Sequence, residues 1–293
     1  MPSDRANGIS GESQDFARRY GPWALVAGAS EGVGAAFARA VAARGVNVVL
    51  LARRQPALEE VAADIAAGTG AQTRTLAVDL TAEDAVATVS HATADLEVGT
   101  MMYCAGADPV YQPFLANPVE VPLALVQRNC VVSLQLCHHF AGPMVERGRG
   151  AIVIVSSGAA LAGAPNMVAY GASKAFDIVM AEALWSEVQP RGVDVLALVL
   201  GATDTPALRR LLASRGIIAD PDDPTPIPDT VTAEETAAEA VANLSNGPTW
   251  FVGDQLRAAS EYLRTVSRNE AVNLMIQGKG GLMDNDRDVD VAP

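Results

Sequence analysis

The chain has 293 residues, of which 49% are hydrophobic and 19% are charged, so it can bury a sizeable core and is not disordered as a whole. Its formal net charge of −13 argues against nucleic acid or an anionic membrane surface as a partner, because both bind through basic patches. The three cysteines, Cys104, Cys130 and Cys137, are an odd number without CxxC spacing, which argues against a disulfide framework and against a metal site.

The beginning of the chain is polar. Met1–Arg19 lacks the apolar stretch of a secretory signal, and no run approaches the ~20 apolar residues that cross a bilayer. We therefore expect a cytoplasmic protein without membrane contact. Residues 1–20 are predicted to be a loosely ordered N-terminal arm, followed by a single domain over residues 21–275.

Beyond the arm, short runs rich in Val, Leu and Ile alternate with longer Ala-rich segments of helical period. This is the pattern of βαβ units, and it predicts an α/β fold with a doubly wound, parallel, seven-stranded Rossmann-type sheet and helices on both faces. The predicted strands are Trp23–Ala27, Asn47–Ala52, Thr73–Val78, Thr100–Cys104, Ala151–Ser156, Asp194–Leu200 and Trp250–Val252. The predicted helices between them are Val33–Arg44, Pro56–Ala67, Pro122–Arg147 and Ala169–Gln189.

A glycine-rich turn follows the first predicted strand. Its residues are Gly28, Ala29, Ser30, Glu31, Gly32, Val33 and Gly34. Glycines let a backbone approach a pyrophosphate closely, and the N-terminus of the next helix stabilises its charge. Glycines also mark ordinary turns, but the strand before and the helix after are what nucleotide binding requires.

The spacing Gly-x-x-x-Gly-x-Gly resembles the glycine motif of the short-chain dehydrogenases/reductases, and the resemblance extends over roughly Tyr20 to Pro206. In that family an acidic residue ends the second strand when the cofactor is NAD. Here Ala52 stands at that position, followed by Arg53 and Arg54. Arginines there can pair with the 2′-phosphate of NADP, so the resemblance implies NADP(H) in preference to NAD(H). The competing interpretation is that both arginines belong to a solvated loop.

Two more segments after strands match cofactor contacts of the family. Asp79 matches the aspartate that contacts the adenine, with Leu80 beside it. The segment after the fourth strand consists of Cys104, Ala105 and Gly106. Ala27 and Cys104 replace family residues whose side chains hold the backbone near the cofactor, at about 1 kcal/mol for each lost hydrogen bond. We expect these two departures to affect cofactor affinity more than chemistry.

Tyr170 and Lys174 lie four residues apart. On a helix this spacing places both side chains on one face, within reach of each other. A tyrosine with its ordinary pKa of ~10 is a poor acid or base near neutrality, but a close cation favours the phenolate and lowers that pKa. The spacing alone is common on helices.

The resemblance implies a catalytic tetrad of Asn129, Ser157, Tyr170 and Lys174. Tyr170 is implied to exchange a proton with an alcohol or ketone during hydride transfer, and Ser157 to hold the substrate oxygen. Lys174 is implied to lower the tyrosine pKa and anchor the nicotinamide ribose, and Asn129 to hold a relay water. Ser156 could be confused with Ser157, but adjacent side chains on a strand point to opposite faces, and the spacing of thirteen to Tyr170 selects Ser157. No metal is required.

The sixth strand leads into a turn that resembles the Pro-Gly turn of the family, with Leu200 in place of the proline. The resemblance implies that Gly201, Thr203 and Thr205 lie against the cofactor, with Thr205 at the carboxamide.

A proline-rich loop follows. Asp220–Asp229 contains four prolines, which exclude regular helix or strand. It follows a short helical stretch, Pro206–Arg215, and precedes a helix predicted to begin near Thr232. A long loop near the carboxyl edge of such a sheet favours a substrate lid, over about residues 204–231. Near the C-terminus, Ser267 and Glu270 are spaced as a capping box for a last helix, and residues 276–293 are predicted to be a flexible tail.

The substrate is less well defined. Tyr20–Val26 resembles the entry of hydroxysteroid dehydrogenases and β-ketoacyl reductases, and the lid carries several Leu and Ile residues, so we expect a bulky apolar ketone or secondary alcohol. One alternative is an NADP-binding sensor without turnover, which could dispense with the tetrad that this chain keeps. Another is an epimerase or dehydratase on a related fold, whose Gly-x-x-Gly-x-x-Gly spacing is absent. The resemblance also implies a homodimer or homotetramer formed through the helices that carry Asn129 and Tyr170.

Overall fold

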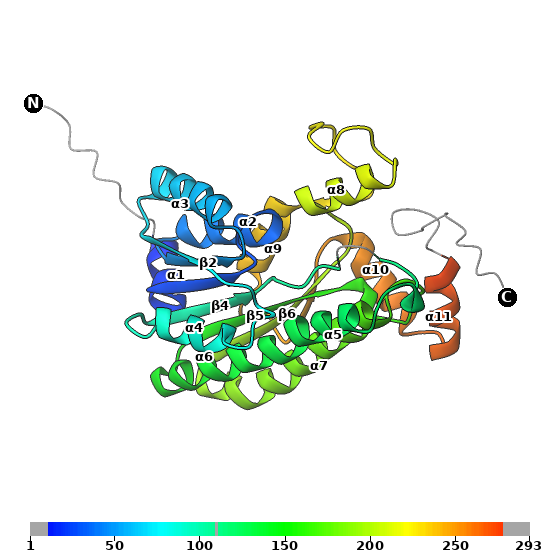
Figure 1. The fold of residues 1–293 in the computed structure, drawn as a ribbon. Coiled ribbons are helices and arrows are strands. Elements are labelled where there is room, and N and C mark those ends of the chain that lie inside the picture. The colour runs from blue at the N-terminus through cyan, green and yellow to red at the C-terminus, as the bar shows by residue number, and fades with distance from the viewer. Residues whose placement is uncertain (1–10, 109–110, 278–293) are drawn as a thin grey trace, which may run out of the picture.

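A computed structural model describes residues 11–108 and 111–277. Its centre is a parallel seven-stranded sheet with the strand order β3-β2-β1-β4-β5-β6-β9 (Figure 1). The strands are β1 (Trp23–Ala27), β2 (Asn47–Ala52), β3 (Thr73–Ala77), β4 (Val98–Tyr103), β5 (Gly150–Ser157), β6 (Val193–Leu200) and β9 (Thr249–Phe251). The predicted doubly wound α/β fold and its seven strands are confirmed. The strand order reverses between β1 and β4, which is where such sheets bind ligands.

Helices cover both faces of the sheet. Their bounds are α1 (Gly11–Tyr20), α2 (Gly32–Ala42), α3 (Gln55–Thr69), α4 (Ala85–Ala92), α5 (Glu120–Val126), α6 (Ser133–Arg147), α7 (Val168–Val188), α8 (Pro206–Ser214), α9 (Ala233–Ala242), α10 (Asp254–Leu263) and α11 (Arg268–Gln277). Short 3-10 turns are η1 (Phe114–Ala116), η3 (Gly158–Ala160) and η4 (Gln189–Arg191). A π-helical segment, η2 (Gln127–Val132), joins α5 to α6 within the single helix predicted over Pro122–Arg147.

The central strands β1, β2, β4, β5 and β6 are mostly apolar because both faces of the sheet are buried there. Alternate residues face opposite sides, so Val26 belongs to the core under α2, α3 and α9, whereas Leu25 belongs to the core under α4, α6 and α7 (Figure 1). These two cores fix the carboxyl ends of β1, β4, β5 and β6 at one edge of the sheet. Within residues 11–108 and 111–277, no helix is both long and apolar enough to span a bilayer.

The prediction of a loosely ordered arm is wrong for residues 11–20, which form α1. Tyr20 is buried, and its hydroxyl donates a hydrogen bond of 2.8 Å to Asp194 of β6. Arg19 forms an ion pair of 2.7 Å with the same carboxylate. Although its sequence is polar, this helix packs Phe16 and Ala17 against the core and binds the buried Asp194.

The predicted lid is built from α8 and the loop after it, which stand out from the body of the molecule (Figure 1). A two-stranded parallel sheet, β7 (Thr203–Asp204) with β8 (Val231–Thr232), closes its base. Arg209 pairs with both carboxylate oxygens of Asp204, at 2.6 and 2.7 Å, and also donates to the carbonyl oxygen of Thr225 at 2.9 Å. Of the predicted tail, Ile276 and Gln277 belong to α11, and residues 278–293 lie outside the described residues.

Candidate active site

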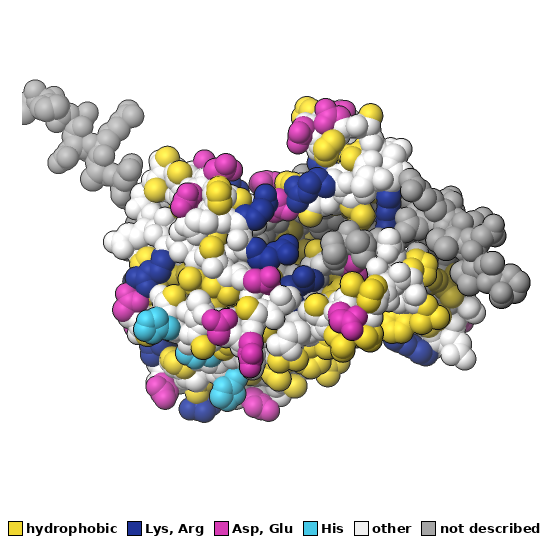
Figure 2. All heavy atoms as spheres, in the orientation of Figure 1, with side chains coloured by type: hydrophobic (Ala, Val, Ile, Leu, Met, Phe, Trp, Pro, Cys, Tyr) yellow, Lys and Arg dark blue, Asp and Glu magenta, His cyan; other side chains and the backbone are white. Residues whose placement is uncertain are grey.

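A cleft of about 790 Å³ runs along the carboxyl edge of the sheet, between the glycine turn, the ends of β4, β5 and β6, the start of α7, and the lid. Figure 2 shows it as a hollow flanked by basic side chains. Eleven of the predicted site residues line it, namely Glu31, Val33, Arg53, Cys104, Gly106, Ser157, Tyr170, Lys174, Gly201, Thr203 and Thr205. The structure therefore brings together residues that are up to 174 positions apart in the sequence, from Glu31 to Thr205.

The glycine turn is tight because its backbone is packed against other backbone. Gly28 has φ +91°, and a Cβ there would lie 2.9 Å from the nitrogen of Ala105. A Cβ on Gly34 would lie 2.2 Å from the carbonyl oxygen of Gly28. Only glycine fits at either position. The result is a bare backbone cradle at the N-terminus of α2, which fits the pyrophosphate of a dinucleotide.

The two serines at the end of β5 have different surroundings. Ser156 is buried and donates a hydrogen bond of 2.7 Å to the carbonyl oxygen of Lys174, so it ties β5 to α7. Ser157 lines the cleft, and its hydroxyl accepts a bond of 3.2 Å from the amide of Ala159. Both serines line the cleft, but the Ser156 hydroxyl is occupied by the Lys174 carbonyl and is buried, whereas Ser157 is more exposed. This difference favours Ser157, the serine that the spacing selects.

Tyr170 and Lys174 lie on one face of α7, as the spacing predicts, and both line the cleft. The Lys174 ammonium lies 5.9 Å from the centre of the Tyr170 ring and is buried. It donates to the carbonyl oxygen of Val155 at 2.9 Å and forms an ion pair with Asp177 at 3.0 Å. Burial lowers the pKa of Lys174, but the nearby Asp177, Tyr170 and Cys104 together outweigh burial, so the pKa is raised.

Asn129 lies beneath the floor of the cleft and is fully buried. Its amide donates to the carbonyl oxygen of Gly106 at 3.0 Å and to the Ser173 hydroxyl at 2.9 Å. A Cβ on Gly106 would meet Asn129 Oδ1 at 2.8 Å and Lys174 Nζ at 3.2 Å, so these groups are close neighbours. The π-helical turn that contains Asn129 explains how an amide occupies this place inside an otherwise apolar helix.

The two arginines after β2 make different contacts. Arg53 lines the cleft, whereas Arg54 turns to Glu31 in the glycine turn, at 2.9 Å. Arg210 of the lid forms an ion pair with the other oxygen of Glu31. Glu31 thus links the glycine turn to α8 across one end of the cleft, and two cations offset its charge.

Nine predicted residues are not among those that line the cleft, namely Gly28, Ser30, Gly32, Gly34, Arg54, Asp79, Leu80, Ala105 and Asn129. Leu80 packs into the core, and the Asp79 carboxylate accepts bonds from the amide and hydroxyl of Thr81, which lower the pKa of Asp79. Thr205 caps α8 through a bond of 3.2 Å from the amide of Leu208, and its methyl group faces Gly32.

Cys104, at the end of β4, stands where the family has an asparagine. Burial raises the pKa of its thiol to about 11, and the Lys174 charge only partly opposes this. The group is therefore a neutral thiol at physiological pH.

Three residues that the sequence patterns do not single out also belong to the site. Tyr111 is buried with its ring edge-on to Tyr170, at 5.4 Å between ring centres. Arg128 lines the cleft, and Asp177 pairs with Lys174. Each lacks a local signal, because its place in the site depends on contacts between elements that are far apart in the sequence.

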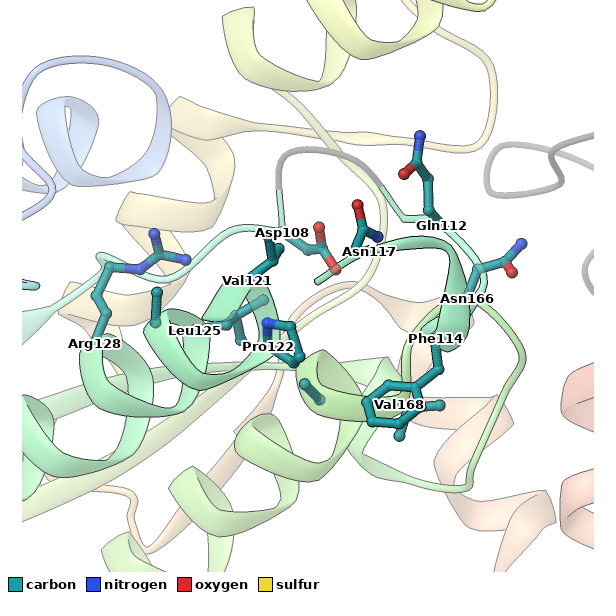
Figure 3. A pocket seen from close by; sticks show the side chains of 12 residues that line it. Asp108, Gln112, Phe114, Asn117, Val121, Pro122, Leu125, Arg128, Asn166 and Val168 are labelled. Carbon is teal, nitrogen blue, oxygen red and sulfur yellow. The ribbon is translucent and has the colours of Figure 1, made fainter. Parts of the chain in front are cut away.

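A side pocket of about 260 Å³ adjoins the cleft and shares Asp108 and Arg128 with it. Figure 3 shows Arg128 at one end and Phe114 with Val168 at the other. Apolar groups such as Leu125 lie beside Arg128, and polar groups such as Asn166 lie beside Phe114, so the lining is mixed along its length. Within the described residues, no three His, Cys, Asp or Glu side chains are grouped as metal ligands.

Comparisons with known proteins agree with this geometry. Residues 22–216 match the family model described as short chain dehydrogenase. A 7beta-hydroxysteroid dehydrogenase from Collinsella aerofaciens is 37% identical over 65% of this chain and 72% of its own length. A human protein named inactive hydroxysteroid dehydrogenase-like protein 1 is 31% identical over 64% of this chain and 58% of its own length.

Solved structures give the same result. A 7beta-hydroxysteroid dehydrogenase studied for its stereoselectivity superposes with a TM-score of 0.79 at 32% identity, over 89% of this chain and 98% of that one. A short-chain dehydrogenase from Sphingobium yanoikuyae in complex with NADPH has a TM-score of 0.72 at 27% identity, over 92% of this chain and 98% of that one.

Proposed function

The chain belongs to the short-chain dehydrogenase family and is an oxidoreductase that acts on CH–OH groups with NAD(P). From this premise we propose that it is an NADP(H)-dependent reductase of bulky apolar ketones, or a dehydrogenase of the corresponding secondary alcohols. The observation that carries the proposal is that Ser157, Tyr170 and Lys174 meet in one cleft, above the buried amide of Asn129. The cleft ends in the glycine cradle of the β1–α2 turn.

The proposed chemistry is an acid–base step next to a cofactor. The nicotinamide ring, when bound, supplies or accepts the hydride. Tyr170 gives a proton to the substrate oxygen during reduction, or takes it during oxidation, and the hydroxyl of Ser157 binds the same oxygen. The Lys174 ammonium places a positive charge 5.9 Å from the centre of the Tyr170 ring, and it is also placed to bind the ribose. Asn129 holds the floor of the site beneath Lys174.

The preference for NADP(H) is supported by charge. Arg53 lines the cleft next to the glycine turn, at the end of β2 where no carboxylate stands. Glu31 would repel a 2′-phosphate, but its charge is offset by Arg54 and Arg210. A cationic end of the cleft therefore favours the extra phosphate. The NADPH complex of the Sphingobium relative is in line with this assignment.

The apolar walls of the cleft support a bulky apolar substrate. Leu208 and Leu211 of the lid, Met167 before α7, and Met275 of α11 present apolar groups to it. Two of the relatives are named 7beta-hydroxysteroid dehydrogenases, and a hydroxysteroid would suit such walls. We therefore expect steroid-sized ketones to be better substrates than small aliphatic ones.

The test is a screen of NADPH oxidation, at 340 nm, against ketones from small aliphatic to steroid size. The proposal predicts turnover that rises with the apolar bulk of the ketone. Turnover that is confined to small polar carbonyls would contradict the substrate class, and a preference for NADH would contradict the cofactor.

The sensor is the second candidate, because one relative carries the word inactive in its name. It predicts that NADPH binds with no turnover of any carbonyl in the panel. The screen separates the two, since tight binding without oxidation supports only the sensor.

We also propose that the protein is a homodimer or homotetramer. α5 and α7 carry exposed apolar side chains on adjoining surfaces, and Figure 2 shows apolar groups gathered along these helices. The most exposed large apolar side chains on these two helices are Leu123 of α5 and Val179 of α7, at 59% and 65%. Such a face is typical of a subunit interface.

A further inference from the structure

Asp177 is a buried acid that the chemistry described above does not use. It lies on α7 one turn beyond Lys174, and its side chain is 1% exposed. A carboxylate in such a place loses its hydration, which is costly unless a cation pairs with it. The burial raises the pKa of Asp177, and Lys174 only partly opposes this.

The contacts of Asp177 are made with the centre of the active site. Its Oδ2 lies 3.0 Å from the Lys174 ammonium, which also donates to the carbonyl oxygen of Val155 at 2.9 Å. An ammonium has three N–H donors, so these two bonds leave at most one for the cleft. The pair therefore fixes both the position of the lysine nitrogen and the direction of its remaining donor.

Five other titratable groups interact electrostatically with Asp177 or Lys174. They are the phenols of Tyr103 on β4 and Tyr170 on α7, and the thiols of Cys104 after β4, Cys130 on η2 and Cys137 on α6. Burial raises the pKa of Cys137 to about 12, and it raises that of Cys104 to about 11, so both are neutral near physiological pH. With these thiols neutral, the Asp177 carboxylate is the group that balances the charge of the Lys174 ammonium.

Burial of the Asp177 carboxylate also costs free energy of folding. Within the described residues, Oδ1 of Asp177 has no hydrogen-bond partner, although it is buried. An unsatisfied carboxylate oxygen destabilises the fold, and an apolar side chain would fill this place without that penalty. A role in the site accounts for the carboxylate where packing does not.

We propose that Asp177 is a positioning residue of the active site, which keeps the buried Lys174 protonated and holds its ammonium against the carbonyl of Val155. Without the carboxylate, a lysine at this depth loses its proton, because desolvation disfavours the charged form. The cation beside Tyr170 then disappears, and with it the support for proton transfer. The catalytic consequence rests on the proposed function, whereas the charge of Lys174 does not.

The chain allows a direct test, because Lys174 and Lys279 are its two lysines. In protein made with ¹³Cε-lysine, a pH titration followed by NMR gives two signals, and Lys279→Arg identifies that of Lys174. In the wild-type protein Lys174 is expected to titrate above the ordinary lysine value despite its burial. Titration of Lys174 below Lys279 would overturn the proposal, and this arm requires no variant at residue 177.

The second arm compares Asp177→Asn with Asp194→Asn. Asp194 is also buried and paired with an arginine, but it lies at the opposite end of the sheet beside α1. Asp177→Asn is expected to lower the pKa of Lys174 by at least about one unit, which is the usual size of an opposite-charge effect. Asp194→Asn is expected to leave it unchanged. Equal behaviour of the two variants would contradict the proposal.

The third arm measures activity. In Asp177→Asn the alkaline limit of ketone reduction is expected to move to lower pH by the same amount as the lysine titration, because Lys174 loses its proton more readily without the nearby anion. A fall in kcat at unchanged limits would show a structural role and overturn the assignment. If no ketone is reduced by the wild-type protein, the proposed function fails, while the NMR arms still decide the role of Asp177.

Discussion

Individual charged residues at the cofactor end of the cleft lead to a prediction about specificity. Arg53 lines the cleft, whereas Arg54 is engaged with Glu31. Arg53→Ala is expected to raise the Kd of NADPH by about tenfold or more, because a charge-assisted bond contributes roughly 1.5 to 3 kcal/mol. The Kd of NADH should change little, since it has no 2′-phosphate. Titration of the nicotinamide fluorescence measures both.

The matched variant is Arg54→Ala, which removes a neighbouring arginine of similar exposure. It should weaken NADPH binding less than Arg53→Ala does, because its direct partner is a protein carboxylate. If both variants lose the same affinity for NADPH and NADH, the arginines do not discriminate between the cofactors.

Single residues also mark the limit of what the sequence predicts. The pairing of Tyr170 with Lys174 could be predicted because residues four apart share one face of a helix, whereas Ser157 was selected by the family resemblance. Asp177 carries no such signal, since its role depends on burial between α7 and η2, and on the neighbours that burial supplies. The Arg53 and Arg54 pair was predicted as a unit, and only the fold distinguishes the two.

One arginine joins the base of the lid to its proline-rich loop. Arg209 joins Asp204 at the base of the lid to the carbonyl oxygens of Asp223 and Thr225 in the proline-rich loop. Arg209→Ala should loosen that loop, so limited proteolysis between residues 220 and 229 becomes faster. The KM for a bulky ketone should rise severalfold, while the melting temperature changes little.

Arg191→Ala is the control, because that arginine is exposed on η4 and away from the lid. It should alter neither proteolysis nor KM. Unchanged cleavage in Arg209→Ala would mean that the loop is held by other contacts.

The helix α1 gives a prediction about stability. Tyr20→Phe removes the hydrogen bond to the buried carboxylate of Asp194 and leaves that group with Arg19. The free energy of unfolding should fall by about 1 to 3 kcal/mol, which is the cost of leaving a buried polar group less satisfied. Urea unfolding measures it, with the exposed Tyr262→Phe as a control that should be neutral.

Elements were predicted to different degrees for physical reasons. Buried parallel strands are continuous apolar runs, so their positions were predicted within about two residues. The helix α1 was missed because its sequence is polar and its contacts, which are the packing of Phe16 and an ion pair with Asp194, are made with distant parts of the chain. The π-helical turn of η2 was missed because nothing in its sequence distinguishes it from the α-helix around it.

The molecule as a whole has an acidic surface with an apolar face on α5 and α7. If this face joins subunits, Leu123→Glu with Val179→Glu should convert the oligomer to a smaller species, which light scattering after size exclusion detects. Ile217→Glu, which is also exposed but lies after α8, should leave the mass unchanged. A monomeric wild-type protein would exclude the proposed assembly.

At this scale the alternation of apolar runs and helical segments was sufficient to predict the fold class, because a parallel sheet requires crossover helices. The match to solved 7beta-hydroxysteroid dehydrogenase coordinates agrees with that prediction. The substrate could not be predicted in the same way, since the lid and the cleft walls assemble from many distant segments, and only their joint shape selects a ligand.

The central claim is that Tyr170 moves a proton in this cleft, and Tyr170→Phe tests it most directly. With the best ketone from the panel and NADPH, the variant should lose at least about 100-fold in kcat, which is the usual contribution of general acid catalysis. The Kd of NADPH should stay within about twofold of the wild-type value, because phenylalanine keeps the ring and its contact with Tyr111 and removes only the hydroxyl. Retained turnover with unchanged cofactor binding would contradict the account.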